Sequence, residues 1–225
     1  DQDDVWEFNK VEDMMEVLEK NLQIKSLSCS FSKIDQKGHF LKNCKKRPFS
    51  SNNNLIRKSI KANSVENITL AQVITYNISP GCTCAFKREI KKDFLNNELQ
   101  IPHDWAINFI SASVDGLYFF NKKLIKYRLH SSNTIGLTRS LDRIDRLRIC
   151  KSGLKEIMEM RKFLEKNNFS LNYIDKIIKV FEKREEALHK KSIIKCLRNI
   201  LLSLHMNGLI DTTFVDLLSV LKREK

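Results

Sequence analysis

The sequence contains no pair of cysteines with the spacing of a zinc site. Its six cysteines, at positions 29, 44, 82, 84, 150 and 196, include no CxxC pair. Cys82 and Cys84 form a lone CxC, and on a strand both side chains would point to the same face. We therefore expect no zinc site and interpret the cysteines as reduced thiols of a cytosolic protein.

Long apolar stretches are also missing. No run approaches the roughly 20 residues that cross a bilayer, so we expect no membrane-spanning helix. The first residues are acidic rather than basic and then apolar, so we expect no signal peptide. Because the chain begins with Asp1 rather than Met, we expect that a preceding segment was removed or was never included. We find no internal repeat.

Acidic residues are in the minority. The chain has 40 Lys and Arg residues against 27 Asp and Glu residues, a net charge of +13. Such a balance favours nucleic acid, an anionic membrane surface or phosphorylated ligands as partners. No acid occurs between Asp35 and Glu66, and residues 42–61 are basic and rich in Asn and Ser. This stretch is either a solvated insertion or an element that binds an anionic ligand.

The remaining composition is typical of a soluble globular protein. With 225 residues, 42% of them hydrophobic, the chain can form one large domain or a domain and a half. Residues 9–21 have helical periodicity, and residues 22–34 alternate as a strand with one slip in register. The pattern also predicts strands over 82–86, 117–120 and 124–129, helices over 87–95 and 103–114, and a helix or strand over 68–76. Four helices are predicted after residue 137, over 139–166, 171–191, 192–206 and 211–223.

The segment Asp1-Gln2-Asp3-Asp4 concentrates carboxylates at one point. Like charges this close repel each other unless a cation or a basic group lies among them. Hard oxygen ligands suit Mg²⁺ or Mn²⁺, which bind through one or two carboxylates together with substrate phosphates. The alternative is an acidic, solvated chain terminus.

Three stretches of sequence carry a resemblance when they are taken together. Residues 1–6 read Asp-Gln-Asp-Asp-Val-Trp, with Asn9-Lys10 close behind. Residues 81–86 read Gly-Cys-Thr-Cys-Ala-Phe and are followed, after a predicted helix, by Ile-Pro-His-Asp-Trp at 101–105. Residues 124–130 read Leu-Ile-Lys-Tyr-Arg-Leu-His. In this order and at these separations, they resemble the second half of a family 2, GT-A type bacterial glycosyltransferase, and rhamnosyltransferase-like members in particular.

The resemblance implies an α/β fold. Residues 1–137 would form the C-terminal part of a Rossmann-like GT-A nucleotide-diphospho-sugar transferase domain, and residues 138–225 an all-helical C-terminal region. In this family the nucleotide-base pocket is built by strands that precede the acidic DXD motif. We therefore expect that part of the domain to be missing from this chain.

The resemblance assigns donor-side roles to four residues. Asp1 is similar to the first acid of the DXD motif, near the donor ribose or metal, and Asp3 to the main ligand of Mg²⁺ or Mn²⁺. A metal there would neutralise the leaving phosphate. Arg128 and His130 lie two apart on a predicted strand and could together meet the diphosphate and its metal. The alternatives are a helix-start carboxylate for Asp3 and a solvated edge-strand pair for Arg128 and His130.

The resemblance also assigns acceptor-side roles. Asp104 is similar to the general base that removes the proton of the acceptor hydroxyl, with a plain helix N-cap as the alternative. His103 would contact the acceptor or lie in a loop, and Trp105 would wall the acceptor pocket or belong to the core. Gly81, Cys82 and Thr83 would form the loop beside the donor sugar and acceptor. Cys84 stands where the family usually has Met, and Ala106 where a bulky aromatic is common, which leaves the acceptor size open.

The predicted C-terminal helices carry no family motif. The basic residues Lys190, Lys191, Lys195 and Arg198 flank the apolar residues Ile193, Ile194, Leu197, Ile200 and Leu201. This pattern suits a helix that lies on an anionic membrane leaflet, and it also suits a helix packed in a bundle.

The expected function is that of an inverting, metal-dependent glycosyltransferase of cell-surface polysaccharide biosynthesis. The resemblance implies a UDP- or dTDP-sugar donor and a saccharide or lipid-linked saccharide acceptor. It also implies a cytoplasmic location, with peripheral contact to the inner face of the plasma membrane. Nucleic acid is not expected as a partner under this interpretation. The alternative is a non-catalytic, basic helical module that binds an anionic membrane surface or nucleic acid.

The expected lack of the nucleotide pocket gives a first prediction. We expect this 225-residue chain alone to bind UDP- or dTDP-sugars poorly, with or without Mn²⁺, in isothermal titration calorimetry. Tight, metal-dependent binding would show that these residues contain a complete donor site.

Overall fold

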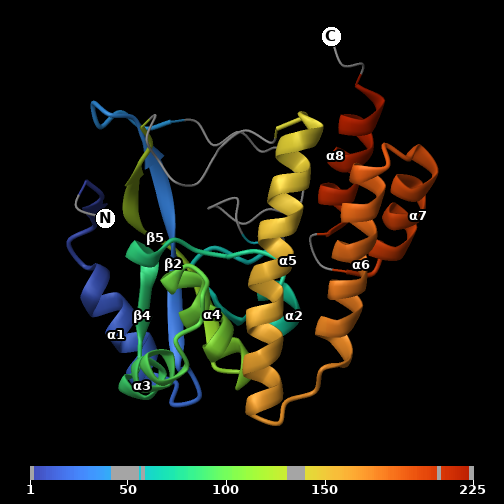
Figure 1. Cartoon of the computed structure of the whole chain (residues 1–225). Helices are drawn as coiled ribbons and strands as arrows, with labels where there is room; N and C mark the ends of the chain where they lie inside the picture. The colour runs from blue at the N-terminus through green and yellow to red at the C-terminus, as the bar shows by residue number, and fades with distance from the viewer. Residues whose placement is uncertain (1–2, 42–55, 57–58, 131–139, 207–208, 223–225) are drawn as a thin grey trace. The chain divides into compact units, whose positions relative to one another are not determined.

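The structure is a computed structural model that describes residues 3–41, 56, 59–130, 140–206 and 209–222 (Figure 1). The chain divides into two compact units. The first contains Asp1–Val73, Asn77–Glu98 and Pro102–Thr134, and the second contains Ile74–Tyr76, Leu99–Ile101 and Ile135–Lys225. Sheet and helices together make the protein a mixed α/β structure.

The first unit is built on a mixed sheet. Its strands are β1 (Val5–Trp6), β2 (Ser26–Ile34), β3 (Val65–Asn67), β4 (Cys84–Phe86) and β5 (Leu117–Arg128). The order is β1-β5-β2-β4, and β3 also pairs with β5. β2 and β5 run parallel, whereas the other pairs are antiparallel. The helical elements of this unit are α1 (Lys10–Lys20), α2 (Leu70–Val73), the 3₁₀ turn η1 (Gly81–Thr83), α3 (Arg88–Asn97) and α4 (His103–Ser113).

The long strand β5 corrects the prediction of two short strands. It is continuous over 12 residues, including the predicted break at 121–123. The pattern was broken there because the register with β2 shifts: Cys29 lies opposite Phe120, and the next pair is Ser30 with Lys123. Such a bulge places extra residues on one strand and turns its side chains out of alternation. The predicted slip in residues 22–34 is wrong. It came from the spacing of Ile24 and Leu27, but Ile24 precedes β2, and the extra residues of the bulge lie on β5.

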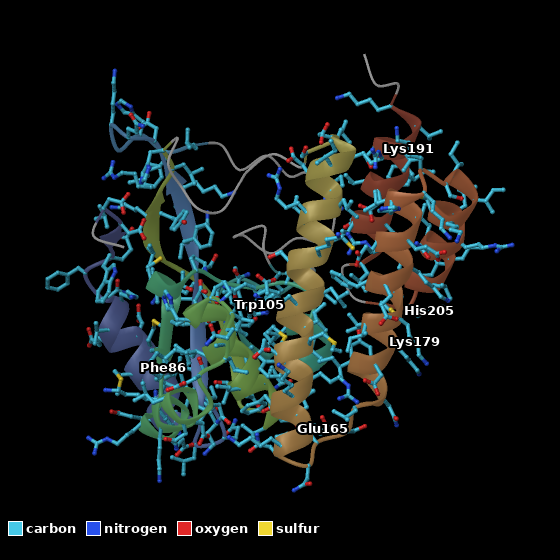
Figure 2. All side chains as sticks on the ribbon, in the orientation of Figure 1. Phe86, Trp105, Glu165, Lys179, Lys191 and His205 are labelled. Carbon is cyan, nitrogen blue, oxygen red and sulfur yellow. The ribbon has the colours of Figure 1, made fainter. Side chains whose placement is uncertain are left out.

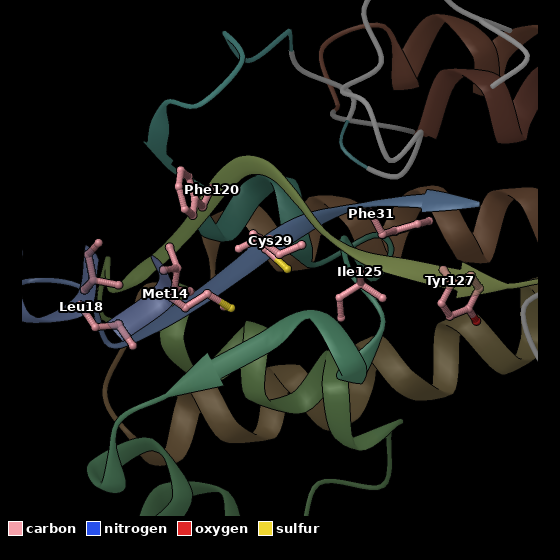
Figure 3. Packing of buried hydrophobic residues seen from close by; sticks show 10 residues of the cluster. Met14, Leu18, Cys29, Phe31, Phe120, Ile125 and Tyr127 are labelled. Carbon is pink, nitrogen blue, oxygen red and sulfur yellow. The ribbon is translucent and has the colours of Figure 1, made fainter. Parts of the chain in front are cut away.

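One face of β2 packs on α1 to form a hydrophobic core. Leu27, Cys29 and Phe31 point to this side, where Met14 and Leu18 of α1 meet them. Figure 3 shows this cluster together with Phe120, Ile125 and Tyr127 of β5. The alternate residues of β2 point to the other face, and there the side chains of Ser26, Ser28 and Ser30 are fully buried. β2 therefore has one apolar face and one hydroxyl face, both covered by protein.

The turn between α4 and β5 depends on a glycine. Gly116 accepts backbone hydrogen bonds from Lys25 and Ser26 at 2.8 and 3.0 Å. A Cβ atom at Gly116 would lie 2.3 Å from Cγ of Lys25, so any other residue would collide with that side chain. The preceding Asp115 has φ +54°, in the left-handed region.

The described residues of the second unit form four helices, as the sequence predicts. They are α5 (Arg143–Lys166), α6 (Asn172–His189), α7 (Ile193–Ser203) and α8 (Leu209–Leu221). Asp142 caps α5 by accepting a hydrogen bond from Asp145 N, and Ser192 caps α7 by accepting one from Lys195 N. No helix among the described residues is long and apolar enough to cross a membrane.

A buried charge triad joins three of these helices. Asp216 of α8 accepts hydrogen bonds from Arg146 of α5 at 2.7–2.8 Å and from Arg184 of α6 at 2.7 Å. All three side chains are at least 95% buried. One carboxylate therefore holds two guanidinium groups away from water, where an unpaired charge is very unfavourable.

This triad predicts that Asp216→Asn destabilises the helical unit. The amide cannot neutralise either arginine, and we expect a loss of about 3–5 kcal/mol in the free energy of unfolding. Urea denaturation followed by ellipticity at 222 nm measures it. The matched control is Asp175→Asn, because Asp175 also accepts from an arginine Nε at 2.8 Å but is 41% exposed. We expect the control to cost about 1 kcal/mol or less, and equal losses would contradict the buried-triad explanation.

Candidate functional site

The pairing of β1 with β5 brings the first acids next to the end of β5. Val5 lies opposite Lys126 in an antiparallel register, so residues before β1 meet residues at and beyond Arg128. His130 Nε2 and Asp3 Oδ2 are 2.7 Å apart although 127 residues separate them in the sequence. This hydrogen bond is the first cause of a lowered pKa of Asp3. The predicted donor-side residues Asp3 and His130 therefore lie together, whereas Asp1 is outside the described residues.

Arg128 binds backbone rather than projecting away from the protein. Its Nε donates to Asp3 O at 2.9 Å, and its Nη1 donates to the carbonyls of Asp35 and Gln36 at 3.0 and 2.9 Å. Its backbone N–H donates to Asp4 Oδ1 at 2.9 Å. These bonds hold the Asp3-Asp4 segment and the turn after β2 against β5. Arg128 thus positions the acidic segment in this structure.

The loop at Gly81 lies against the start of α4. A Cβ atom at Gly81 would lie 3.2 Å from His103 Nε2 and 3.6 Å from Asp104 Cβ. The loop therefore approaches the two residues as closely as a glycine allows. This contact joins two stretches that the sequence separates by a whole helix, α3.

Asp104 lies in the first turn of α4 and is not its N-cap. The N-cap residue is Pro102, so the alternative of a plain capping role for Asp104 is wrong. Asp104 Oδ1 accepts a hydrogen bond from Trp105 N at 2.8 Å, which orients the carboxylate at the helix start, where the helix dipole favours negative charge.

Trp105 and Thr83 are parts of the interior. Trp105, labelled in Figure 2, is 8% exposed and donates from Nε1 to Val73 O at 2.7 Å. This placement supports the core interpretation of Trp105 over that of a pocket wall. Thr83 is fully buried, and its hydroxyl donates to Pro80 O at 2.7 Å, which shapes the turn. Of the predicted acceptor-side residues, His103 is exposed, while Gly81 and Cys82 are half-buried.

A buried lysine connects the acidic segment with the Gly81 loop. Lys10 is 4% exposed, and its Nζ donates to Cys82 O at 2.8 Å and lies 3.4 Å from the centre of the Trp6 ring. Burial lowers the pKa of Lys10. The pKa of the Cys82 thiol is raised, first by burial and then by the neighbouring Asp4 carboxylate. Asp4, Lys10 and Cys82 thus form one cluster between the two halves of the site.

The sequence contained a pattern that marks Lys10. On α1 the buried positions are Lys10, Met14 and Leu18, which recur every four residues along one face. A lysine in the apolar stripe of an amphipathic helix must find a partner for its ammonium group. Sequence reasoning quoted Lys10 as part of the family motif but gave it no role.

A polar network supports the loop from below. Ser79 Oγ donates to Ser28 Oγ at 2.8 Å, and Asn108 Nδ2 donates to Ser79 Oγ at 3.1 Å. The Cys84 sulfur is 3.2 Å from Ser28 Oγ. Burial raises the pKa of the Cys84 thiol, so the sulfur is held as a neutral group that packs and hydrogen-bonds. Ser28, on the hydroxyl face of β2, therefore contacts the residues on both sides of the Gly81 loop, Ser79 and Cys84.

The described residues contain no group of three or more His, Cys, Asp or Glu side chains that could hold a metal ion. Asp3 and His130 supply one carboxylate and one imidazole. The carboxylate is the kind of ligand that Mg²⁺ and Mn²⁺ prefer, whereas an imidazole is more typical of transition metals.

No protein-family model, no curated protein and no solved structure matches this chain. The resemblance to a family therefore rests on the sequence motifs alone.

Lys10 gives a prediction about the loop. We expect Lys10→Met to keep the aliphatic packing of the stem but to release the Cys82 carbonyl, so that the backbone of residues 79–86 opens more often. Hydrogen–deuterium exchange of peptides from this segment measures the change. The control is Lys20→Met, because Lys20 lies on the same helix but is exposed. Equal exchange in both variants would show that Lys10 does not tether the loop.

Proposed function

We propose that the protein is an inverting, metal-dependent glycosyltransferase. It uses a nucleotide-sugar donor and a saccharide or lipid-linked saccharide acceptor, and its first unit is the acceptor-side part of a GT-A core. One observation carries this proposal. Four segments that are far apart in the sequence, residues 3–6, 81–86, 102–105 and 124–130, belong to one compact unit, where hydrogen bonds and close contacts join them in pairs.

On the donor side, Asp3 and His130 are the residues that would hold the divalent cation. The carboxylate of Asp3 is ionised at neutral pH like an ordinary aspartate, and the hydrogen bond with His130 lowers its pKa further. When bound, Mg²⁺ or Mn²⁺ neutralises the charge that develops on the departing diphosphate. The Arg128 side chain donates a hydrogen bond to the backbone carbonyl of Asp3. Its role in this proposal is therefore to position Asp3.

On the acceptor side, Asp104 takes the proton. The acceptor oxygen attacks the anomeric carbon as the bond from that carbon to the diphosphate oxygen breaks, and the configuration inverts. The proton of the acceptor hydroxyl passes to the Asp104 carboxylate, which Trp105 N orients. The Gly81 loop contacts His103 and Asp104 at one end and, through Cys82, is fixed to Lys10 at the other. Lys10 thus fixes the Gly81 loop to α1.

Two substitutions in the natural gene product test these roles. We expect Asp104→Asn to lower kcat by about 10²–10⁴-fold, because the amide cannot accept the proton. We expect Asp3→Ala to weaken the Mn²⁺ dependence and to lower turnover. A panel of nucleotide sugars, with transfer and donor hydrolysis measured by released nucleotide, provides the assay.

The matched control for Asp104 is Asp93→Asn, because Asp93 is an exposed acid on the neighbouring helix α3. It should leave turnover unchanged, and circular dichroism should show that all three variants are folded. If transfer or hydrolysis survives both Asp104→Asn and Asp3→Ala at the wild-type level, the proposed function with these roles is wrong.

A further inference from the structure

Helix α7 buries its small and polar residues and exposes its large apolar ones. The residues that face the helical unit are Cys196, Asn199 and Ser203. On the other side, Ile193, Ile194, Leu197, Leu201 and Leu204 are all exposed, Ile194 and Leu201 each to 65%. An amphipathic helix that only packs in a bundle has the opposite arrangement. The exposed side, named here the α7 face, is defined by these five residues.

The rotation of α7 is fixed by specific contacts. Ser192 caps its first turn, and Lys195 forms an ion pair with Glu186 of α6. Near the other end, the hydroxyls of Ser203 and Thr213 of α8 are 2.9 Å apart. Turning the helix to bury its leucines would break the contacts of Lys195 with Glu186 and of Ser203 with Thr213. The α7 face is therefore a stable surface of the unit.

Charge identifies the partner of this face. No Asp or Glu occurs between Glu186 and Asp211, whereas Lys190, Lys191, Lys195 and Arg198 all lie in this interval. Lys190 and Lys195 form ion pairs with Glu186. Arg198 is exposed and lies four residues after Ile194 and three before Leu201, so it borders the α7 face directly. Lys191 and His205, labelled in Figure 2, precede and follow the helix. Aliphatic side chains bordered by cations match a bilayer surface with anionic head groups.

A second copy of the chain fits this face less well. A symmetric dimer would place the same surface against itself, and each basic border would then face another basic border. Nucleic acid would meet the basic residues, but an aliphatic surface offers no aromatic ring on which bases stack.

We infer that the α7 face docks the protein on an anionic lipid bilayer, with Ile194, Leu197 and Leu201 inserted among the lipids and Arg198 at the head groups. The inference adds a partner to the proposed function, since lipid-linked acceptors lie in such a surface. It rests on α7 alone, so vesicle binding tests it without any measurement of donor binding, metal binding or turnover.

Co-sedimentation of the whole chain with vesicles tests the inference. We expect binding to vesicles of equal parts phosphatidylcholine and phosphatidylglycerol, weak binding to pure phosphatidylcholine, and a decrease with salt. The combined variant Ile194→Ser, Leu197→Ser and Leu201→Ser should bind more than about tenfold more weakly, because three aliphatic side chains no longer leave water. The matched control replaces three exposed apolar residues of α5, Ile144, Ile149 and Met158, by Ser and should bind like the wild type.

Two further measurements separate the other occupants. Arg198→Glu should weaken binding to the anionic vesicles and leave the urea midpoint unchanged. A fall in the midpoint of the triple α7 variant would show that the α7 face packs inside the protein, which overturns the inference. If the wild type is a dimer that does not bind vesicles, and the triple variant is a monomer, the α7 face is the interface with a second copy. Asp104→Asn should bind vesicles like the wild type, so failure of the proposed function does not affect this result.

Discussion

The arrangement of the first unit depends on the pairing of β5 with strands on both of its sides. β2 lies parallel to it along nearly its whole length, and the two-residue strand β1 pairs with its last third. The second pairing is short, so side chains reinforce it: Arg128 binds the carbonyl of Asp3, and Asp4 accepts from the Arg128 backbone. Without this pairing, the acidic segment would have no fixed relation to His130 or to the Gly81 loop.

Polar groups, rather than apolar packing alone, define both units. In the first, the hydroxyls of Ser28 and Ser79 and the ammonium group of Lys10 are buried beside the loop that they support. In the second, Asp216 holds two arginines in the interior. Buried polar groups must find partners, and only a few geometries satisfy them. They therefore fix the backbone more narrowly than aliphatic contacts would.

Much of this fold could be predicted from the sequence. Local periodicity was sufficient for α1 and for the four helices described in the second unit. It failed where the information is not local. The bulge at residues 121–123 was interpreted as a loop, because a bulge and a turn interrupt alternation in the same way. The parallel pairing of β2 with β5, across about ninety residues, has no local pattern at all.

The candidate site was predictable in part for the same reason. The family resemblance implied that Asp3 and His130 share the donor side, and that the Gly81 loop and Asp104 share the acceptor side. It could not show that Thr83 and Trp105 turn into the core, since threonine and tryptophan suit both a pocket and an interior. Nor could it show that the serines of β2 are buried, because alternating serines are equally typical of a strand with one face in water.

The hydrogen bond between Asp3 and His130 has a thermodynamic consequence. It closes a loop of 127 residues that contains the whole sheet. Closing so long a loop lowers the conformational entropy of the chain. Here the pairing of the strands already brings the two ends together, so the hydrogen bond adds little further loss of entropy. Any ligand that bridges the two side chains therefore binds only the folded unit. By mass action, a higher concentration of such a ligand raises the stability of the pairing between the first and last strands.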